Sequence, residues 1–255
     1  MRASIERMTQ EIAKILDRQV HSVWLYGSVV LGDFRLGWSD LDFLVLTKAP
    51  ITEAQAAQLL PLRQRLSAQD PDNLYFRCFE GVIANWEEYL AGRYIRLVYW
   101  GTSGQRVCDR YEADVFSRYE LARYGERICG EGDRLLFSVP DREEMIAAVR
   151  NHYEAIRRYA VQTDESLYSC GWLLDIARCL YTLRHGTVIG KTQAGRWALE
   201  ERLFADERPM RQALLVRENP LEYKDRPAIR AWLRELGPSV QAYADVLEEE
   251  LRKYP

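Results

Sequence analysis

The spacing of hydrophobic and polar positions changes near the middle of the chain. Up to about residue 100, short runs rich in Val, Leu, Phe, Tyr and Trp stand between polar stretches, which is typical of half-buried strands. From residue 140 onward these strand signals disappear, and apolar residues recur at helical spacing instead. The predicted strands are HSVWLY, LDFLVLT, NLYFRCFEGVIA and YIRLVYW.

Helix-start and helix-stop residues delimit the predicted helices. Thr52 and Gln55 form a capping-box pattern, and Pro61 kinks or divides the helix that they open. Asp141 can cap the first helix of the second half, and Gly186 can end the next one. The predicted helices of that half run over residues 143–160, 166–184, 192–203, 209–217, 227–236 and 238–252.

This order of elements predicts an α+β fold in two domains. We expect an N-terminal α/β domain with a mixed sheet over residues 1–139 and an all-helical domain over residues 140–255. The boundary is set by the change of period near residues 138–141.

The composition, 47% hydrophobic and 29% charged, is that of a soluble globular protein. No apolar run approaches the roughly 18–20 residues that span a bilayer, and residues 1–16 read as an amphipathic helix rather than a signal peptide. The five cysteines are scattered and form no CxxC pair, so neither a disulfide framework nor a zinc site is indicated. We therefore expect a cytoplasmic protein without a membrane partner.

The net charge of −3 argues against a nucleic-acid partner, because proteins that grip a phosphate backbone are usually basic. A mildly acidic protein is better matched to a cationic small substrate. Nothing in the sequence fixes the oligomeric state.

The most informative segment is residues 24–47, WLYGSVVLGDFRLGWSDLDFLVLT. An apolar strand ends at Gly27-Ser28, and Asp40-Leu41-Asp42 opens the next apolar strand. Residues two apart on a strand point to one face, so Asp40 and Asp42 project together. Two adjacent carboxylates repel each other unless a cation neutralises them, and all-oxygen ligands favour Mg²⁺. We predict that Asp40 and Asp42 are metal ligands.

Gly27 and Ser28 are predicted to bind phosphate. Gly27 has no Cβ, so the backbone can approach a ligand closely, and the Ser28 N–H and hydroxyl can donate to phosphate oxygens. A helix starting at Ser28 would add a favourable field for anions.

A third carboxylate is expected, to complete the metal site or to accept the proton of an attacking hydroxyl. Glu80 is the candidate, because it lies in the apolar run FRCFEGVIA, where an unpaired carboxylate would be costly. The alternative is an ion pair with Arg77 or Arg96. Glu87 and Glu88 are the fallback acids.

The motif resembles that of the nucleotidyltransferase superfamily that includes DNA polymerase beta, and within it the antibiotic nucleotidyltransferases. Gly27, Ser28, Asp40 and Asp42 match it, and Ser39 matches a serine often found before the first Asp. The resemblance implies that the two aspartates hold a pair of Mg²⁺ ions that bridge the phosphates of ATP, the co-substrate. It also implies that Glu80 is the catalytic base.

The second half, residues 173–203 above all, is similar to the C-terminal domain of the aminoglycoside 3″-adenylyltransferases, which modify streptomycin and spectinomycin. The resemblance implies that Lys191 contacts the triphosphate, although a solvated lysine at a helix start is an alternative. Arg196 stands where those enzymes carry an aspartate that contacts the cationic drug, which puts streptomycin in doubt. Trp100 stands near a drug-stacking Trp of the family, and buried packing is the alternative.

We therefore expect an adenylyltransferase that transfers AMP from Mg·ATP to a hydroxyl of a small molecule, an aminoglycoside or a related antibiotic. Two alternatives stay open: an antitoxin-like enzyme that modifies a protein partner, and a non-enzymatic nucleotide-binding module.

Overall fold

The computed structural model describes residues 1–101 and 104–254, and these form two compact units. The N-terminal unit comprises residues 1–30 and 39–139. The helical unit comprises the chain from residue 140 onward together with residues 31–38. The segment between the Gly-Ser and Asp-x-Asp motifs is therefore packed with the helices.

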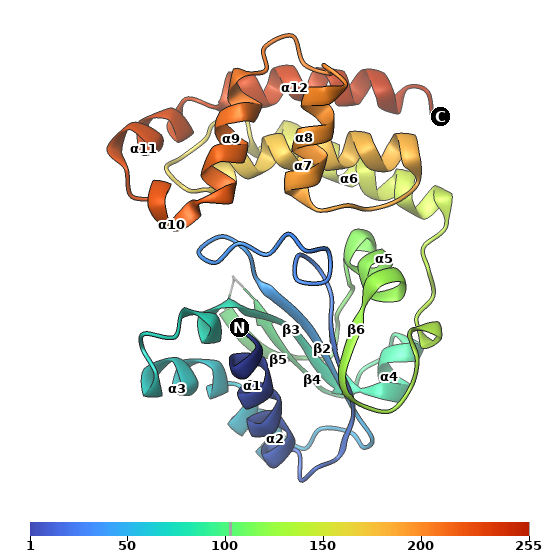
Figure 1. The fold of residues 1–255 in the computed structure, drawn as a ribbon. Coiled ribbons are helices and arrows are strands. Elements are labelled where there is room, and N and C mark those ends of the chain that lie inside the picture. Colours follow the sequence, from blue (N-terminus) through green and yellow to red (C-terminus); the bar gives the residue numbers. More distant parts are fainter. Residues whose placement is uncertain (102–103, 255) are drawn as a thin grey trace. The chain divides into compact units, whose positions relative to one another are not determined.

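The N-terminal unit is built on a mixed six-stranded sheet of order β5-β4-β3-β2-β1-β6, which confirms the predicted fold class (Figure 1). Strands β2 and β3 are parallel, and the other neighbouring pairs are antiparallel. The strands are β1 (Val20–Leu25), β2 (Leu41–Thr47), β3 (Phe79–Asn85), β4 (Leu97–Gly101), β5 (Gly104–Cys108) and β6 (Glu126–Gly130).

Helices cover both faces of this sheet (Figure 1). One face carries a core of Trp24, Leu44, Val82 and Leu97, packed with Leu121 from α5. The helices and 3-10 turns of the unit are α1 (Arg2–Ile15), α2 (Glu53–Leu59), α3 (Leu62–Gln69), η1 (Leu74–Cys78), α4 (Trp86–Ala91), α5 (Val115–Tyr124) and η2 (Arg134–Leu136).

The alternation of side chains places the acids of the motif on this same face. Asp42 lies two residues before Leu44 on β2, and Glu80 lies two residues before Val82 on β3. Because residues two apart share a face, both carboxylates extend the apolar core at its open end.

The helical unit has its core along α7, where Leu173, Ile176 and Leu180 are fully buried. Helix α7 packs against α6, α8, α9 and α12. The helices are α6 (Arg142–Tyr159), α7 (Tyr168–His185), α8 (Lys191–Glu200), α9 (Arg208–Glu218), α10 (Pro220–Tyr223), α11 (Pro227–Arg234) and α12 (Gly237–Leu251).

The predicted helix ends are confirmed. Thr52 with Gln55 and Asp141 with Glu144 form reciprocal capping boxes, and Gly186 ends α7 in the left-handed region at φ 69°. Pro61 divides the predicted helix into α2 and α3. Among the described residues, no strand follows β6.

Two local predictions are wrong, and two strands were missed. No helix starts at Ser28, where the chain forms turns. Residues 74–78 form η1 instead of strand, because the Asn73 side chain accepts a hydrogen bond from the Tyr75 N–H and begins a turn. Strands β5 and β6 were not predicted, since both are sheet edges whose residues are mostly polar and exposed.

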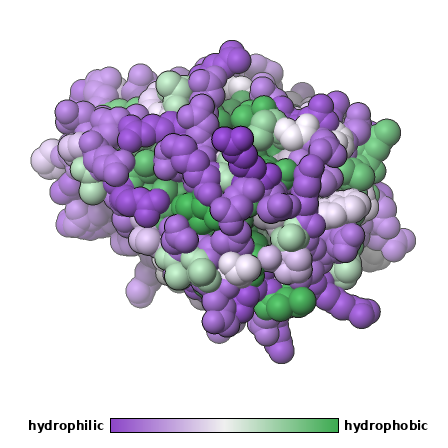
Figure 2. All heavy atoms as spheres, turned by 90° about the horizontal axis from the view of Figure 1, so that it is seen from below, coloured by the Kyte–Doolittle hydropathy of each residue, from purple (hydrophilic) through white to green (hydrophobic). Residues whose placement is uncertain are grey.

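The face of the molecule seen in Figure 2 is mostly hydrophilic, with apolar side chains in separate small groups. Among the helices of the described residues, none combines the length and apolar character needed to cross a membrane.

Candidate active site

Position 27 requires a glycine because the Asp42 side chain lies directly against it. It follows β1 with φ +68°, a conformation that favours glycine. A Cβ at this position would collide with the Asp42 carboxylate. The next residue, Ser28, donates its backbone N–H to that carboxylate, and its Oγ donates to the Asp40 carbonyl oxygen over 3.4 Å. The two halves of the motif therefore contact each other directly.

Four carboxylates form an acid cluster, which we define as Asp40, Asp42, Glu80 and Glu120. Asp42 and Glu80 are direct neighbours in the parallel pairing of β2 and β3. Asp40 immediately precedes β2, and Glu120 reaches the cluster from α5, where it is only 4% exposed.

Burial raises the pKa of Asp42 well above its usual range, and repulsion from Glu120, Asp40 and Glu80 raises it further. The hydrogen bond from the Ser28 N–H opposes this shift. An ionised Asp42 therefore requires added positive charge. The donor set consists of carboxylate oxygens, which suits Mg²⁺, so the chemistry of the cluster fits a divalent cation.

The surroundings of Glu80 differ from the predicted ion-pair alternative. Tyr99 donates its hydroxyl to Glu80 Oε1 at 3.1 Å, and the nearby cation is Arg63. Arg96 instead binds Glu53 and the Ile51 carbonyl oxygen, and Arg77 donates to the carbonyl oxygen of Pro71.

The fallback acids, Glu87 and Glu88, begin α4 at the other end of β3, so the strand separates them from the acid cluster.

The Tyr99 hydroxyl stays protonated and can donate to Glu80. Burial raises the pKa of Tyr99, and the adjacent Glu80 charge raises it further.

Trp100 lies in the core. Its side chain is 0% exposed, and its ring packs 5.3 Å from that of Phe43. Because Tyr99 shares the face of the acid cluster, its neighbour Trp100 points to the opposite face of the sheet. The expected contact between Trp100 and a substrate is therefore wrong, and the packing alternative holds.

Arg196 is exposed on α8 and forms an ion pair with Glu218. Its positive charge is therefore matched, which weakens the expected repulsion of a cationic acceptor. Lys191 is the first residue of α8, and its Nζ lies 3.6 Å from Asp175 Oδ1. Ser39 is buried directly before Asp40.

Sequence reasoning missed Glu120 and Asp175, two of the four acids that are buried among the described residues. Both stand in segments whose neighbouring residues are apolar and buried, VFSRYELARY and GWLLDIARCL. The same criterion that singled out Glu80, an acid without an adjacent base in a buried run, would have marked Asp175. Glu120 has Arg118 two residues away, and helical spacing alone does not assign it to the acid face.

Two family models match this chain, one in its N-terminal half and one in its C-terminal half. A family model described as a nucleotidyltransferase domain matches residues 9–109, and one described as the aminoglycoside adenylyltransferase C-terminal domain matches residues 134–237. The spectinomycin 9-adenylyltransferase of Enterococcus faecalis is 24% identical over 247 residues, covering 91% of this chain and 87% of that protein.

A solved structure has the same fold. The crystal structure of spectinomycin adenyltransferase AAD(9) from Enterococcus faecalis, with ATP and spectinomycin, matches with a TM-score of 0.63 and 19% identity. The match covers 95% of this chain and 97% of that one. The chain thus resembles the aminoglycoside adenylyltransferases along most of its length, and it is an enzyme of the nucleotidyltransferase class.

Proposed function

We propose that this enzyme transfers AMP from ATP to a hydroxyl group of an aminocyclitol antibiotic of the spectinomycin type, releasing pyrophosphate. The acid cluster carries the proposal, because closely spaced carboxylates beside a Gly-Ser turn suit nucleotidyl transfer with a divalent cation. The relative named for spectinomycin supports the acceptor class. The Arg196–Glu218 pair is compatible with a cationic acceptor.

In this proposal Asp40 and Asp42 hold Mg²⁺, which would neutralise charge on the phosphates of ATP and on the displaced pyrophosphate. When ATP binds, the Ser28 hydroxyl would exchange its long 3.4 Å hydrogen bond to the Asp40 carbonyl oxygen for one to a phosphate oxygen. The Ser28 N–H, which donates to Asp42, keeps that carboxylate oriented.

Glu80 accepts the proton of the acceptor hydroxyl as its oxygen attacks the α-phosphorus. The bond from the α-phosphorus to the bridging oxygen breaks, and the electron pair leaves with pyrophosphate. Tyr99 donates to one carboxylate oxygen of Glu80, Oε1, which leaves the other available for the proton.

The test is pyrophosphate release from Mg·ATP with spectinomycin, streptomycin and a lincosamide as acceptors. Asp42→Asn and Glu80→Gln test the cluster, and Glu126→Gln, an exposed acid on β6, is the matched control. We expect release with spectinomycin, loss of at least ~100-fold in both cluster variants, and no change in the control. ATP binding without release for any acceptor would contradict the proposal.

A further inference from the structure

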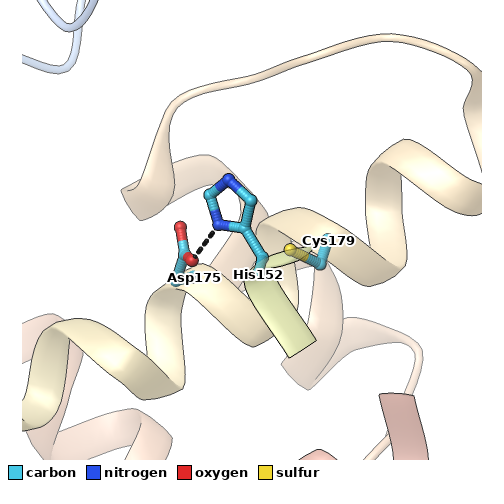
Figure 3. A group of neighbouring side chains, drawn as sticks. All are labelled: His152, Asp175 and Cys179. Carbon is cyan, nitrogen blue, oxygen red and sulfur yellow. Dashed lines mark hydrogen bonds and ion pairs between the residues drawn. The ribbon is translucent and has the colours of Figure 1, made fainter. Parts of the chain in front are cut away.

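Asp175, a buried acid on α7, is matched by side chains that contact its carboxylate directly. His152 Nδ1 lies 2.6 Å from Oδ2, as Figure 3 shows, and Arg178 Nη2 lies 2.8 Å from Oδ1. The ligand atoms of His152, Asp175 and Cys179 also lie within 4.8 Å of one another, but the two contacts explain this cluster without a metal ion.

The cation beside Glu80 is placed differently. Arg63, on α3, donates from Nη1 to the Phe79 carbonyl oxygen at 2.7 Å and from Nη2 to the Gly101 carbonyl oxygen at 3.4 Å. Both hydrogen bonds of its guanidinium thus go to the backbone, one to β3 and one to β4. Arg63 therefore ties two neighbouring strands together.

The two carbonyl groups lie at the same end of the sheet, because β3 begins at Phe79 and the antiparallel β4 ends at Gly101. The Phe79 carbonyl belongs to the planar peptide group that leads into Glu80, so holding it restricts the backbone at Glu80. The Tyr99 ring lies against Gly101, where a Cβ would collide with it. Arg63 therefore fixes both backbone sites on which the hydrogen bond from Tyr99 to Glu80 depends.

The chemistry of arginine suits this contact. A guanidinium is a rigid planar fork that reaches two acceptors at once, which an ammonium group does not reproduce. Burial lowers the pKa of Arg63, and the charges of Glu80 and Asp40 oppose that shift. Helix α3 lies with α1 and α2 on the side of the sheet away from α5 (Figure 1), so the fork holds the strands from behind the acid cluster.

We propose that Arg63 is a positioning residue for Glu80, whose two backbone hydrogen bonds hold the ends of β3 and β4 in the geometry that lets Tyr99 orient the catalytic carboxylate. The inference rests on the proposed function, in which Glu80 accepts the proton of the acceptor hydroxyl. In this role Arg63 acts on the reaction through Glu80 and contacts neither the nucleotide nor the acceptor.

The test is a double-mutant cycle on turnover. The kcat and KM of pyrophosphate release, with spectinomycin as acceptor, are measured for the wild type, Arg63→Met, Glu80→Gln and the double variant. We expect Arg63→Met to lower kcat at least ~10-fold, because small displacements of a reacting group slow a reaction strongly. The KM for ATP should stay unchanged. The double variant should turn over as fast as Glu80→Gln alone, since residues that act as a unit are not additive.

Two further variants separate the fork from its charge and from general stability. Arg63→Lys keeps the positive charge without the two-pronged contact, so its kcat should be closer to that of Arg63→Met than to that of the wild type. Arg96, at the other end of β4, is the matched control, because it donates to the Ile51 carbonyl oxygen at 2.7 Å and to Glu53 at 3.0 Å. Arg96→Met should lower the thermal midpoint and leave kcat unchanged.

The outcomes distinguish this inference from the proposed function. A wild-type protein that releases no pyrophosphate with any acceptor, or full turnover in Glu80→Gln, would overturn both. An active wild type, an impaired Glu80→Gln and an unchanged kcat in Arg63→Met would overturn the role of Arg63 alone. Losses that multiply in the double variant, or wild-type turnover in Arg63→Lys, would do the same.

Discussion

Asp33 and Arg217 form an ion pair at 2.8 Å in which both side chains are 3% exposed. The same Asp33 oxygen accepts the backbone N–H of Thr192 in the first turn of α8, and Arg217 Nε donates to the Thr192 hydroxyl. This network anchors residues 31–38 among the helices. Ser28 and Asp40, which flank that segment, belong to the sheet-containing unit.

Breaking this pair on one side should be strongly destabilising. Arg217→Met leaves a buried carboxylate without its cation, which costs about 3–5 kcal/mol in comparable buried pairs. We expect a lower thermal midpoint for Arg217→Met and partial recovery in Asp33→Asn with Arg217→Met. Calorimetric scans of the three proteins test this, and an equal midpoint in the wild type and Arg217→Met would refute it.

The contribution of Asp33 should depend on pH. Burial alone would raise its pKa, but Arg217 and Thr192 outweigh burial and lower it from 3.8. A group whose pKa is lower in the folded state stabilises fully above its unfolded pKa, and that stability is lost as pH falls through the folded value. The difference in urea midpoint between wild type and Asp33→Asn should therefore be constant near neutral pH and shrink in acid below 3.8. A difference that grows in acid would contradict the assignment.

Gly27→Ala should lower activity strongly because its Cβ would displace Asp42, and Gly32→Ala is the matched control for this effect. Gly27 and Gly32 have nearly equal positive φ angles, 68° and 67°. A Cβ on Gly27 would collide with Asp42, whereas a Cβ on Gly32 would meet nothing within 4 Å. Both variants bear a similar backbone strain of about 1–2 kcal/mol, and only Gly27→Ala displaces an acid of the cluster.

We expect at least ~100-fold lower turnover for Gly27→Ala, since small displacements of reacting groups have effects of this size. Gly32→Ala should keep most of its turnover. Steady-state rates of pyrophosphate release, measured beside circular dichroism spectra, compare the two. Equal losses in both variants would show that backbone strain, and not the contact with Asp42, is responsible.

Glu120→Gln should affect the protein differently with and without a divalent cation. Removing one of four close carboxylates relieves repulsion, so the thermal midpoint in EDTA should rise or stay constant. The increase in midpoint on adding Mg²⁺ should become smaller, because less negative charge then attracts the cation. An unchanged response of the variant to Mg²⁺ would show that Glu120 does not contribute to cation binding by the cluster.

Local sequence patterns determined most of the strands and helices of this protein and the class of its enzyme motif. Period-two alternation predicted that LDFLVLT is a strand, and it placed Asp42 on the face that Leu44 and Leu46 share with the core. Capping boxes at Thr52 and Asp141 form because each depends on residues within three positions. The Gly-Ser and Asp-x-Asp pattern predicted the class of enzyme.

Tertiary structure alone decided which distant residues meet. Glu120 joins the acid cluster because α5 packs on the same sheet face as β2 and β3. Trp100 is buried because its ring packs against Phe43 on the sheet face opposite the acid cluster. Residues 31–38 pack with the helices because the Asp33 charge, removed from water, is matched by Arg217, 184 positions further along the chain. Burial and charge matching depend on the whole fold, which a local period does not encode.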